Sequence, residues 1–376
     1  MTAKPDVVLV IIIIVTVVIV LKVTHMWNKK FSKMEDRTTK DVFYGDGKID
    51  SLPQPHIESE EWEDAPGSVF RAFNPSVTSV GQDLIFSYRV SNYVACPKGS
   101  GKATRSIFGM TDNRVKSFTM LSNEEGDVVY LDAPERAEPK CVSGYEDPRI
   151  IGSPDGDFLY IVCNSHSNTS CFTEMHLIKI PTLDLKRAFK TSAKPRTVSV
   201  KDDQILRLRE KSEDIPTRNQ KNWMPFFSKG DLMFVYSVNP HIILKCDMKT
   251  GICTKVAETH NPNVNEALRG SSQARRYGDN YIAVAHWRTS SHSYLSQAYM
   301  FRGKAPYDIL SISPTFVIED QRVLALSMIQ FVSGLEIVDD TAFIAYGESD
   351  CDSKLFTVSM ESLLNSMEDV TKNSED

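Results

Sequence analysis

The chain has 376 residues, of which 41% are hydrophobic and 24% are charged. This composition is typical of a globular protein and excludes a largely disordered chain. The formal net charge is -6, and no basic stripe with interleaved aromatic residues is present, which argues against a nucleic-acid partner.

The N-terminus carries the clearest topological signal. After a short tail (residues 1–6), residues 7–21 are aliphatic throughout except for Thr16. A spanning helix needs about 20 residues, so a span over residues 7–24, extended by snorkelling of Lys22, is short but sufficient. The alternative is a cleaved secretion signal, but no small-residue cleavage site follows the apolar segment. We therefore expect an uncleaved signal-anchor, with the membrane as a partner.

Two features of the sequence give opposite predictions for the orientation of this anchor in the membrane. Lysines are concentrated in residues 22–33, after the span, which favours a cytoplasmic body. Seven cysteines and the glycosylation sequon Asn168-Thr169-Ser170 favour a lumenal body instead. Two cysteine pairs are placed to bridge neighbouring strands, Cys163 with Cys171 and Cys246 with Cys253. The cysteine spacing contains no CxxC, so we expect no zinc site.

The segment after the anchor, residues 25–67, is polar and contains three prolines, which predicts a stem or linker partly wrapped on the domain. From residue 68 to residue 365 a unit recurs: a polar opening, a strand, a turn of Gly, Asp or Asn, and a second apolar strand. Residues 366–376 form a polar tail. Short helices or turns are expected at residues 183–190 and 363–369. The five units lie at residues 73–89, 146–162, 221–237, 269–286 and 334–347.

Each unit is too small to bury its own hydrophobic face, which predicts small sheets repeated around an axis. We therefore expect an all-β fold, a five-bladed β-propeller over residues 68–365. A two-sheet sandwich is the alternative, but it would not explain why every unit opens with polar residues at the same phase. In a propeller these openings converge on the central channel and form one site.

The second unit opens with Glu146-Asp147-Pro148-Arg149. Pro148 lacks an N–H and disfavours the helical region for Asp147, so we expect Asp147 to be extended at the entry to a strand. A fixed carboxylate beside a fixed guanidinium suits general acid catalysis or sugar binding, whereas the plainer alternative is a structural salt bridge.

Adjacent residues of an extended chain point to opposite faces, so Glu146 and Asp147 are not expected to act together as a carboxylate pair. If a second carboxylate takes part, Glu336 and Asp350 are the candidates.

Several segments carry a family resemblance when taken in order. They are Asn74-Pro75-Ser76, Tyr88-Arg89, Glu146-Asp147-Pro148-Arg149, Lys221-Asn222-Trp223, His286-Trp287-Arg288 with Tyr294, and Tyr346-Gly347-Glu348-Ser349-Asp350. These segments resemble the five-bladed β-propeller family of β-mannoside phosphorylases and related β-mannosyltransferases. The long segments 91–141 and 167–216 depart from the family pattern, so the acceptor stays undefined.

The resemblance implies inverting β-mannosyl transfer with Asp147 as the proton donor, and it requires no cofactor or metal. It implies a mannose-containing glycan as one substrate, with phosphate, mannose 1-phosphate or a nucleotide sugar as the other. A membrane-anchored enzyme of this kind suits the secretory pathway, so we expect a single-pass protein with a lumenal C-terminal domain. The implied mannosyl-binding residues are Asn74, Arg89, Arg149 and Asp350, with Arg149 also orienting the acid, and the implied phosphate- or donor-binding residues are Arg218, Lys221, His286 and Tyr294.

Several of these residues also have a purely structural interpretation. His286 follows an apolar run and fits a buried inner-strand histidine, Lys221 can lie over Trp223, and Asp350 fits a turn. Two other functions remain open: a glycoside hydrolase on the same propeller, and a carbohydrate-binding propeller without activity. A donor site needs the basic cluster to face Asp147, whereas a hydrolase needs a carboxylate there to activate water.

Overall fold

The computed structural model describes residues 43, 46–52, 70–91, 116–134, 143–167, 170, 172–192, 195–210, 218–289, 293–318 and 329–371. The expected anchor at residues 7–24, the sequon asparagine Asn168 and most of the stem lie outside these ranges. Among the helices that the structure describes, none has the length and hydrophobicity needed to span a membrane.

The described part of the chain is all-β. Its first half contains the strands β1 (Lys48–Ser51), β2 (Arg71–Val80), β3 (Asp83–Ser91), β4 (Lys116–Asn123), β5 (Val128–Asp132), β6 (Ser143–Gly152), β7 (Phe158–His166), β8 (Thr173–Pro181), β9 (Thr197–Ser199) and β10 (Ile205–Glu210). Two short helices lie among them, α3 (Thr182–Lys190) and the 3-10 helix η4 (Asp202–Gln204).

The second half contains the strands β11 (Met224–Ser228), β12 (Asp231–Ser237), β13 (His241–Cys246), β14 (Ile252–Thr259), β15 (Arg269–Gly270), β16 (Arg275–Tyr277), β17 (Asn280–Arg288), β18 (Tyr294–Arg302), β19 (Ile309–Ile312), β20 (Gln330–Val338), β21 (Thr341–Glu348), β22 (Asp352–Ser359) and β23 (Glu368–Asp369). Helix α4 (Met360–Asn365) follows β22.

The hairpins predicted from the sequence are present. They are β2–β3, β6–β7, β11–β12, β16–β17 and β20–β21, all antiparallel. Their turns contain a residue with positive φ, which glycine adopts without steric cost and aspartate or asparagine tolerates. These residues are Gly81, Gly156, Gly230, Gly278 and Asp340.

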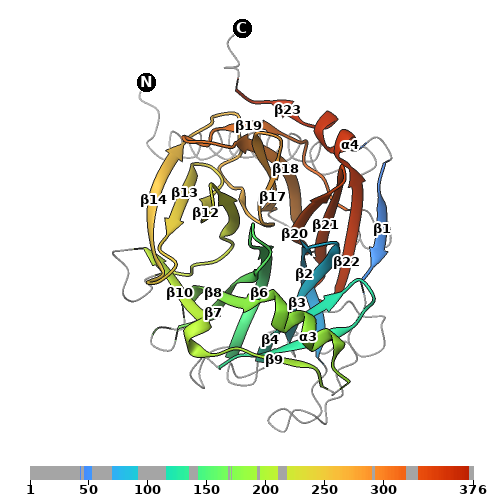
Figure 1. The fold of residues 1–376 in the computed structure, drawn as a ribbon. Coiled ribbons are helices and arrows are strands. Elements are labelled where there is room, and N and C mark those ends of the chain that lie inside the picture. Colours follow the sequence, from blue (N-terminus) through green and yellow to red (C-terminus); the bar gives the residue numbers. More distant parts are fainter. Residues whose placement is uncertain are drawn as a thin grey trace, which may run out of the picture.

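The hairpins and the strands that extend them form groups of strands around a common centre, and β2, β6 and β20 lie nearer to it than β4, β8 and β22 (Figure 1). Strand β2 contacts both β6 and β20, and β6 contacts β11, so elements far apart in the sequence meet there. Hydrophobic clusters fill the spaces between neighbouring groups; one joins β6–β8 and β10 to β11–β14, and another joins β17 and β18 to β20–β22. The innermost residues are polar instead. Gln273, for example, accepts a hydrogen bond from Ser76 Oγ at 3.2 Å.

The N-terminal segment contributes to the last sheet. Strand β1 lies within the predicted stem and pairs antiparallel with β22. Phe43 is fully buried, and its ring lies 5.1 Å from that of Phe316 and 5.8 Å from that of Phe356. The stem region therefore supplies part of the core of this group.

We expect Phe43→Ala to lower the free energy of unfolding by about 3 kcal/mol, because it leaves a cavity between two aromatic rings. Urea denaturation of the full chain would measure this loss. Ile49→Ala on β1 is the matched control, since Ile49 is 37% exposed; it should cost less than about 1 kcal/mol. Equal losses would contradict a core role for Phe43.

The ends of the domain differ in detail from the prediction. The helix expected at residues 183–190 is present as α3, whereas α4 begins at Met360, before the predicted 363–369. Strand β23 pairs with β19, so regular structure continues beyond residue 365, where we expected the tail to begin.

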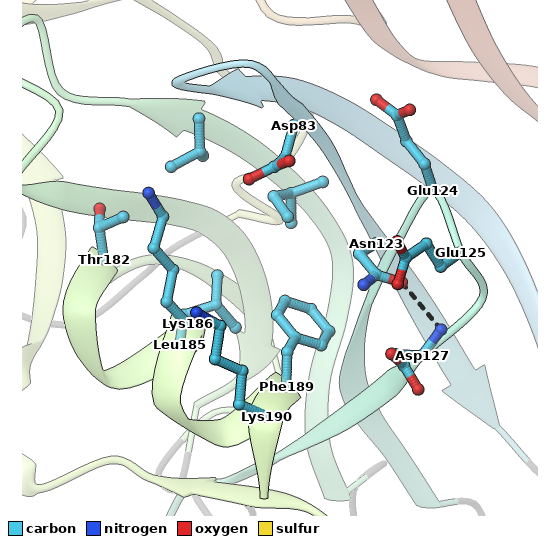
Figure 2. A pocket seen from close by; sticks show the side chains of 12 residues that line it. Asp83, Asn123, Glu124, Glu125, Asp127, Thr182, Leu185, Lys186, Phe189 and Lys190 are labelled. Carbon is cyan, nitrogen blue, oxygen red and sulfur yellow. Dashed lines mark hydrogen bonds between the residues drawn. The ribbon is translucent and has the colours of Figure 1, made fainter.

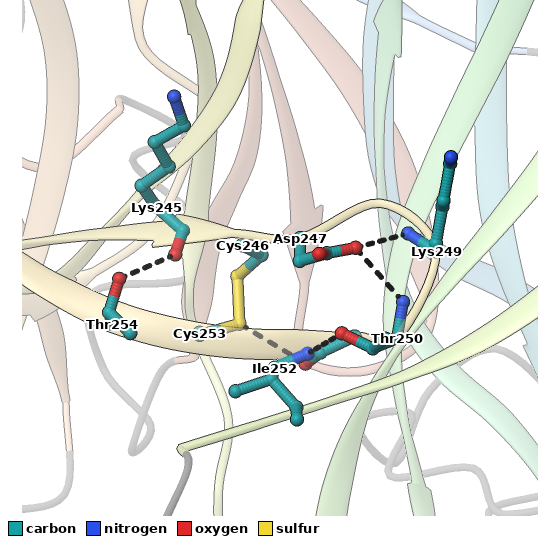
Figure 3. Close-up of a disulfide and its surroundings, with 9 residues drawn as sticks. Lys245, Cys246, Asp247, Lys249, Thr250, Ile252, Cys253 and Thr254 are labelled. Atoms are coloured by element: carbon teal, nitrogen blue, oxygen red, sulfur yellow. Dashed lines mark hydrogen bonds between the residues drawn. A yellow bond between two sulfur atoms is a disulfide. The ribbon is translucent and has the colours of Figure 1, made fainter.

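One of the two predicted disulfides is present. Cys246 and Cys253 are bonded across the β13–β14 hairpin (Figure 3). The Cys163–Cys171 prediction was wrong, because Cys163 is a free, buried cysteine whose thiol faces the carbonyl of His176 on β8 at 3.9 Å. Cys351 is also disulfide-bonded.

A hollow of about 370 Å³ lies between α3 and the β2–β4 region (Figure 2). Lys186 and Lys190 line its helix side, and Asp83, Glu124 and Glu125 line the opposite side. It lies at the end of β2 remote from Asn74, so it is separate from the site described next.

Candidate functional site

Asn74 and Asp147 lie in irregularities of their strands. The pairing register shifts between Phe73 and Ser76 in β2 and between Glu146 and Arg149 in β6. Asn74 has φ 49° and Asp147 has φ 50°, both in the left-handed region. The expected extended conformation of Asp147 was therefore wrong, because a bulge at this point overrides the local influence of Pro148.

The bulges bring Asn74 and Asp147 together. Asn74 Nδ2 donates a hydrogen bond to Asp147 Oδ1 at 2.9 Å, and Arg89 Nη1 donates to the same oxygen at 3.4 Å. Arg89 also forms an ion pair with Glu146. The expectation that Glu146 and Asp147 point to opposite faces was wrong as well, since the bulge breaks the alternation and one guanidinium contacts both carboxylates.

Arg149 holds several strand groups together at the centre. Its side chain is fully buried. It donates to the Asp147 carbonyl at 3.3 Å, to Asn222 Oδ1 at 3.0 Å and to the Ser271 carbonyl. Its guanidinium carbon lies 5.7 Å from the centre of the Phe331 ring. Arg149 therefore links β6 to the openings of the next two units and fixes the backbone of Asp147.

The charge state of Asp147 follows from these neighbours. Burial alone would raise its pKa, but Arg89, the Asn74 amide, Arg149 and Lys221 together outweigh it, and the pKa of Asp147 lies below its usual range. Asp147 is thus a carboxylate at neutral pH in the unliganded chain.

Asp350 follows the end of β21, where Gly347 packs closely against Asn74 of β2. A Cβ added to Gly347 would lie 2.2 Å from Asn74 Oδ1, so only glycine permits this approach. Burial raises the pKa of Asp350 to about 6, with Arg89 opposing the rise and Asp147 adding to it. Two carboxylates with opposite pKa shifts therefore border Arg89, a pattern typical of functional sites.

The raised pKa of Asp350 has a consequence for stability. An unfolded aspartate loses its proton near 3.8, whereas folded Asp350 keeps it to about 6. The contribution of Asp350 to the free energy of unfolding therefore falls as the pH rises from about 4 to about 6. We expect Asp350→Asn to raise the free energy of unfolding at pH 8 by about 1–3 kcal/mol and to change it little at pH 4, as urea unfolding at both pH values would measure. An equal gain at both would contradict this prediction.

His286 lies next to this site as a buried, uncharged ring. Its Nδ1 is 2.7 Å from Ser271 Oγ, and its ring stacks on Tyr294 with centroids 5.0 Å apart. Burial, Arg149 and Arg269 lower its pKa to about 3. His286 can therefore offer hydrogen bonds to a ligand but no positive charge at neutral pH.

The remaining residues predicted to bind the phosphate or sugar donor lie in two separate places. Lys221 is exposed and acts electrostatically on Asp147, and Tyr294 interacts electrostatically with both Asp147 and Asp350. Arg218 lies apart from them, where it donates to Tyr236 Oη at 2.6 Å and pairs with Glu210 at 3.5 Å. The structure thus brings all the predicted site residues except Arg218 into one region.

Glu336 binds other residues, away from the site. It forms an ion pair with Arg275 and accepts a hydrogen bond from the Ser79 amide at 2.6 Å, toward the opposite end of the central strands. Of the two candidate second carboxylates, Asp350 is therefore the one at the site. No group of three or more potential metal-binding side chains occurs in the described ranges.

Sequence reasoning gave no role to four residues that hold the site together. Glu146 and Asn222 lie inside the recognised motifs, and Ser271 lies in the opening of the fourth unit, so position in the repeat could have indicated them. Phe331, whose ring lies 5.1 Å from that of His286, had no such signal.

Comparisons with solved structures show proteins of similar fold. A hydrolase of the GH130 family of mannoside phosphorylases, which targets β-1,2-mannosidic linkages in Candida mannan, is 12% identical with a TM-score of 0.55 over 85% of this chain and 95% of its own. The β-1,2-mannobiose phosphorylase of Listeria innocua is 12% identical with a TM-score of 0.52 over 84% and 94%. The chain resembles this family in fold.

Two curated relatives are matched more locally. Beta-mannosyltransferase 3 of Candida albicans is 27% identical over 164 residues, 43% of this chain. Beta-mannosyltransferase 3 of Komagataella phaffii is 40% identical over 57 residues, 14% of this chain. The matched regions span 27% and 10% of those relatives' own lengths. No family model matches the chain. The resemblance predicted from the sequence is thus supported.

Proposed function

We propose that the chain is a mannoside-active enzyme that transfers β-mannosyl groups with inversion, on a propeller of five blades, with Asp147 as the general acid. The observation that carries this proposal is the convergence of Asn74 and Arg89 from the β2–β3 hairpin, Asp147 from β6, and Asp350 from the end of β21. The names of the similar proteins, which are mannoside phosphorylases, a mannan hydrolase and mannosyltransferases, support the substrate class.

The contacts of Asp147 suit proton donation to a sugar oxygen. Its Oδ1 accepts hydrogen bonds from Asn74 and Arg89. Its Oδ2 has no hydrogen-bond partner among the described residues and is the oxygen we assign to the bridging oxygen or to a sugar hydroxyl that relays the proton. Inverting transfer to a phosphate or hydroxyl nucleophile needs one such acid and no enzyme nucleophile.

To cleave a β-mannoside, Asp147 must first gain a proton, because its pKa is low in the empty site. When a β-mannoside forms from a phosphate-linked donor, the phosphate leaves as an anion and the Asp147 carboxylate accepts the proton of the attacking hydroxyl. The positive charges of Arg149 and Lys221 contribute to that lowering. A bound anionic donor beside Lys221 would offset these charges and raise the pKa of Asp147. Binding of the anion therefore makes Asp147 a stronger base toward the attacking hydroxyl, and in the reverse reaction makes it easier to protonate.

A hydrolase is the second candidate, favoured by Asp350, which is ionised above a pKa of about 6 and could activate water. Against it, Lys221 and Tyr294 border Asp147 in the way a phosphate or nucleotide-sugar user requires. We therefore rank transfer above hydrolysis, and both above a carbohydrate-binding propeller without activity.

The test uses the full chain in detergent with mannose 1-phosphate, a nucleotide-linked mannose, or β-mannobiose with and without phosphate. Nuclear magnetic resonance should detect a β-mannoside formed from an α-linked donor, or α-mannose 1-phosphate released from β-mannobiose. Release of free mannose without phosphate would favour the hydrolase. Binding of mannobiose without any turnover would overturn the proposal in favour of a lectin.

We further propose a single-pass membrane protein of the secretory pathway whose C-terminal domain lies in the lumen. A protease added to intact vesicles should leave a C-terminal tag undigested until detergent is added. Digestion in intact vesicles would show a cytoplasmic domain.

A further inference from the structure

Three exposed basic residues border the site on the side of Lys221 and His286. They are Lys221, Arg269 and Arg288, which we call the basic arc. Nη1 of Arg269 donates to the backbone carbonyls of Glu266 and Leu268, both at 3.0 Å. Within the described ranges, none of the three forms an ion pair with a carboxylate. The nearby Glu266 carboxylate lies 3.2 Å from His260.

Backbone contacts place the first two members of the arc side by side. A Cβ added to Gly270 would lie 2.1 Å from the carbonyl oxygen of Asn222, so the chain segments touch at these two residues. Lys221 and Arg269 are the residues that immediately precede this contact. The two cations therefore start from adjoining points of neighbouring strand groups.

Strand register places Arg288 on the same face as Arg269. Arg269 pairs with His286 across β15–β17, and Arg288 pairs with Tyr294 across β17–β18. Cross-strand partners share a face, as do residues two apart on one strand. The stacking of His286 on Tyr294 confirms that these side chains lie together.

The arc adjoins the acid residues through these two rings. Tyr294 interacts electrostatically with Arg288 and also with Asp350 and Asp147. His286 interacts with Arg149 and also with Arg269. The rings thus lie within reach of both the acid site and the two arginines, and the arc continues from Lys221 beside Asp147 along the next strand group.

One lysine beside the acid can bind a single phosphoryl group. Two further guanidinium groups can donate directed hydrogen bonds to the oxygens of a second phosphoryl group. We propose that Arg269 and Arg288 form a second anion subsite, which takes the outer phosphoryl group of a diphosphate-linked donor while Lys221 takes the inner one. This inference rests on the proposed function and narrows its donor from a monophosphate to a diphosphate.

Binding of pyrophosphate and of inorganic phosphate, measured by calorimetry on the full chain, tests the subsite without any turnover. Wild type should bind pyrophosphate more tightly than phosphate. Arg269→Gln and Arg288→Gln should each weaken pyrophosphate binding about tenfold and the double variant about a hundredfold, while phosphate binding changes less than about threefold. Arg276→Gln is the matched control, because Arg276 is an exposed arginine of the same strand group, beside the β16–β17 turn.

Equal affinities of wild type for the two anions would overturn the subsite, as would losses that are the same for both anions or the same for Arg276→Gln. The two proposals fail separately. Selective pyrophosphate binding without mannosyl transfer would contradict the proposed function and leave the anion subsite standing. Transfer from mannose 1-phosphate without pyrophosphate selectivity would do the reverse.

Discussion

Replacing Asp147 by asparagine is expected to lower the rate of mannosyl transfer from a β-mannoside to phosphate by about a thousandfold, because the amide cannot supply a proton to the departing glycosidic oxygen. The asparagine oxygen can still accept the hydrogen bonds from Asn74 and Arg89 that Asp147 Oδ1 accepts. KM should therefore change little while kcat falls. Steady-state kinetics of the two proteins would measure both.

The choice of leaving group makes this prediction specific to proton donation. A mannoside with an activated aryl leaving group departs without protonation, so the loss caused by Asp147→Asn should shrink to about tenfold or less with that substrate. Glu146→Gln is the matched control. This substitution removes the negative charge of the adjacent residue and weakens its ion pair with Arg89, but it leaves the Asp147 carboxyl group in place. An equal loss with both leaving groups would mean that Asp147 binds the sugar without giving it a proton.

Arg149→Met should lower the free energy of unfolding by about 3–5 kcal/mol. Methionine has a similar length but donates no hydrogen bond, so Asn222 Oδ1 and two backbone carbonyls at the buried centre lose their donor. Leaving buried acceptors unpaired is the dominant cost. Urea or thermal unfolding would measure it, with Arg276→Met as the exposed control.

Arg149→Lys separates charge from geometry. A lysine keeps the positive charge near Asp147 but cannot reach three acceptors in different directions. We expect an intermediate loss of stability and a fall in activity, since the backbone of Asp147 is no longer fixed. A fully stable lysine variant would show that the charge, rather than the three-way link, is what the fold requires.

The sequence predicted the hairpins well, because their signals are local. Alternation of apolar residues and glycine or aspartate at the turns determine where each strand begins and ends, and the structure has every predicted hairpin. The Cys246–Cys253 disulfide was also predicted, since it lies within one hairpin. Cys163 was assigned wrongly because its surroundings depend on packing against β8.

The sequence predicted which residues form the site better than it predicted their backbone conformation. Asn74, Arg89, Asp147 and Asp350 stood out through motifs, whereas the placement of Arg218 depended on a resemblance that the structure does not reproduce at that residue. The left-handed backbone of Asp147 was missed because the local preference of a residue before proline is weaker than the demand of a bulge at the centre of the fold.

The sequence by itself determined the all-β character, the repeated hairpins and most of the residues that approach the centre, because composition and short-range pattern control these. Only the tertiary structure decided the charges of those residues: Asp147 is ionised, Asp350 holds its proton to about pH 6, and His286 is neutral. The reason is that a pKa depends on burial and on neighbouring charges, and at this site the neighbours come from strands that are distant in the chain.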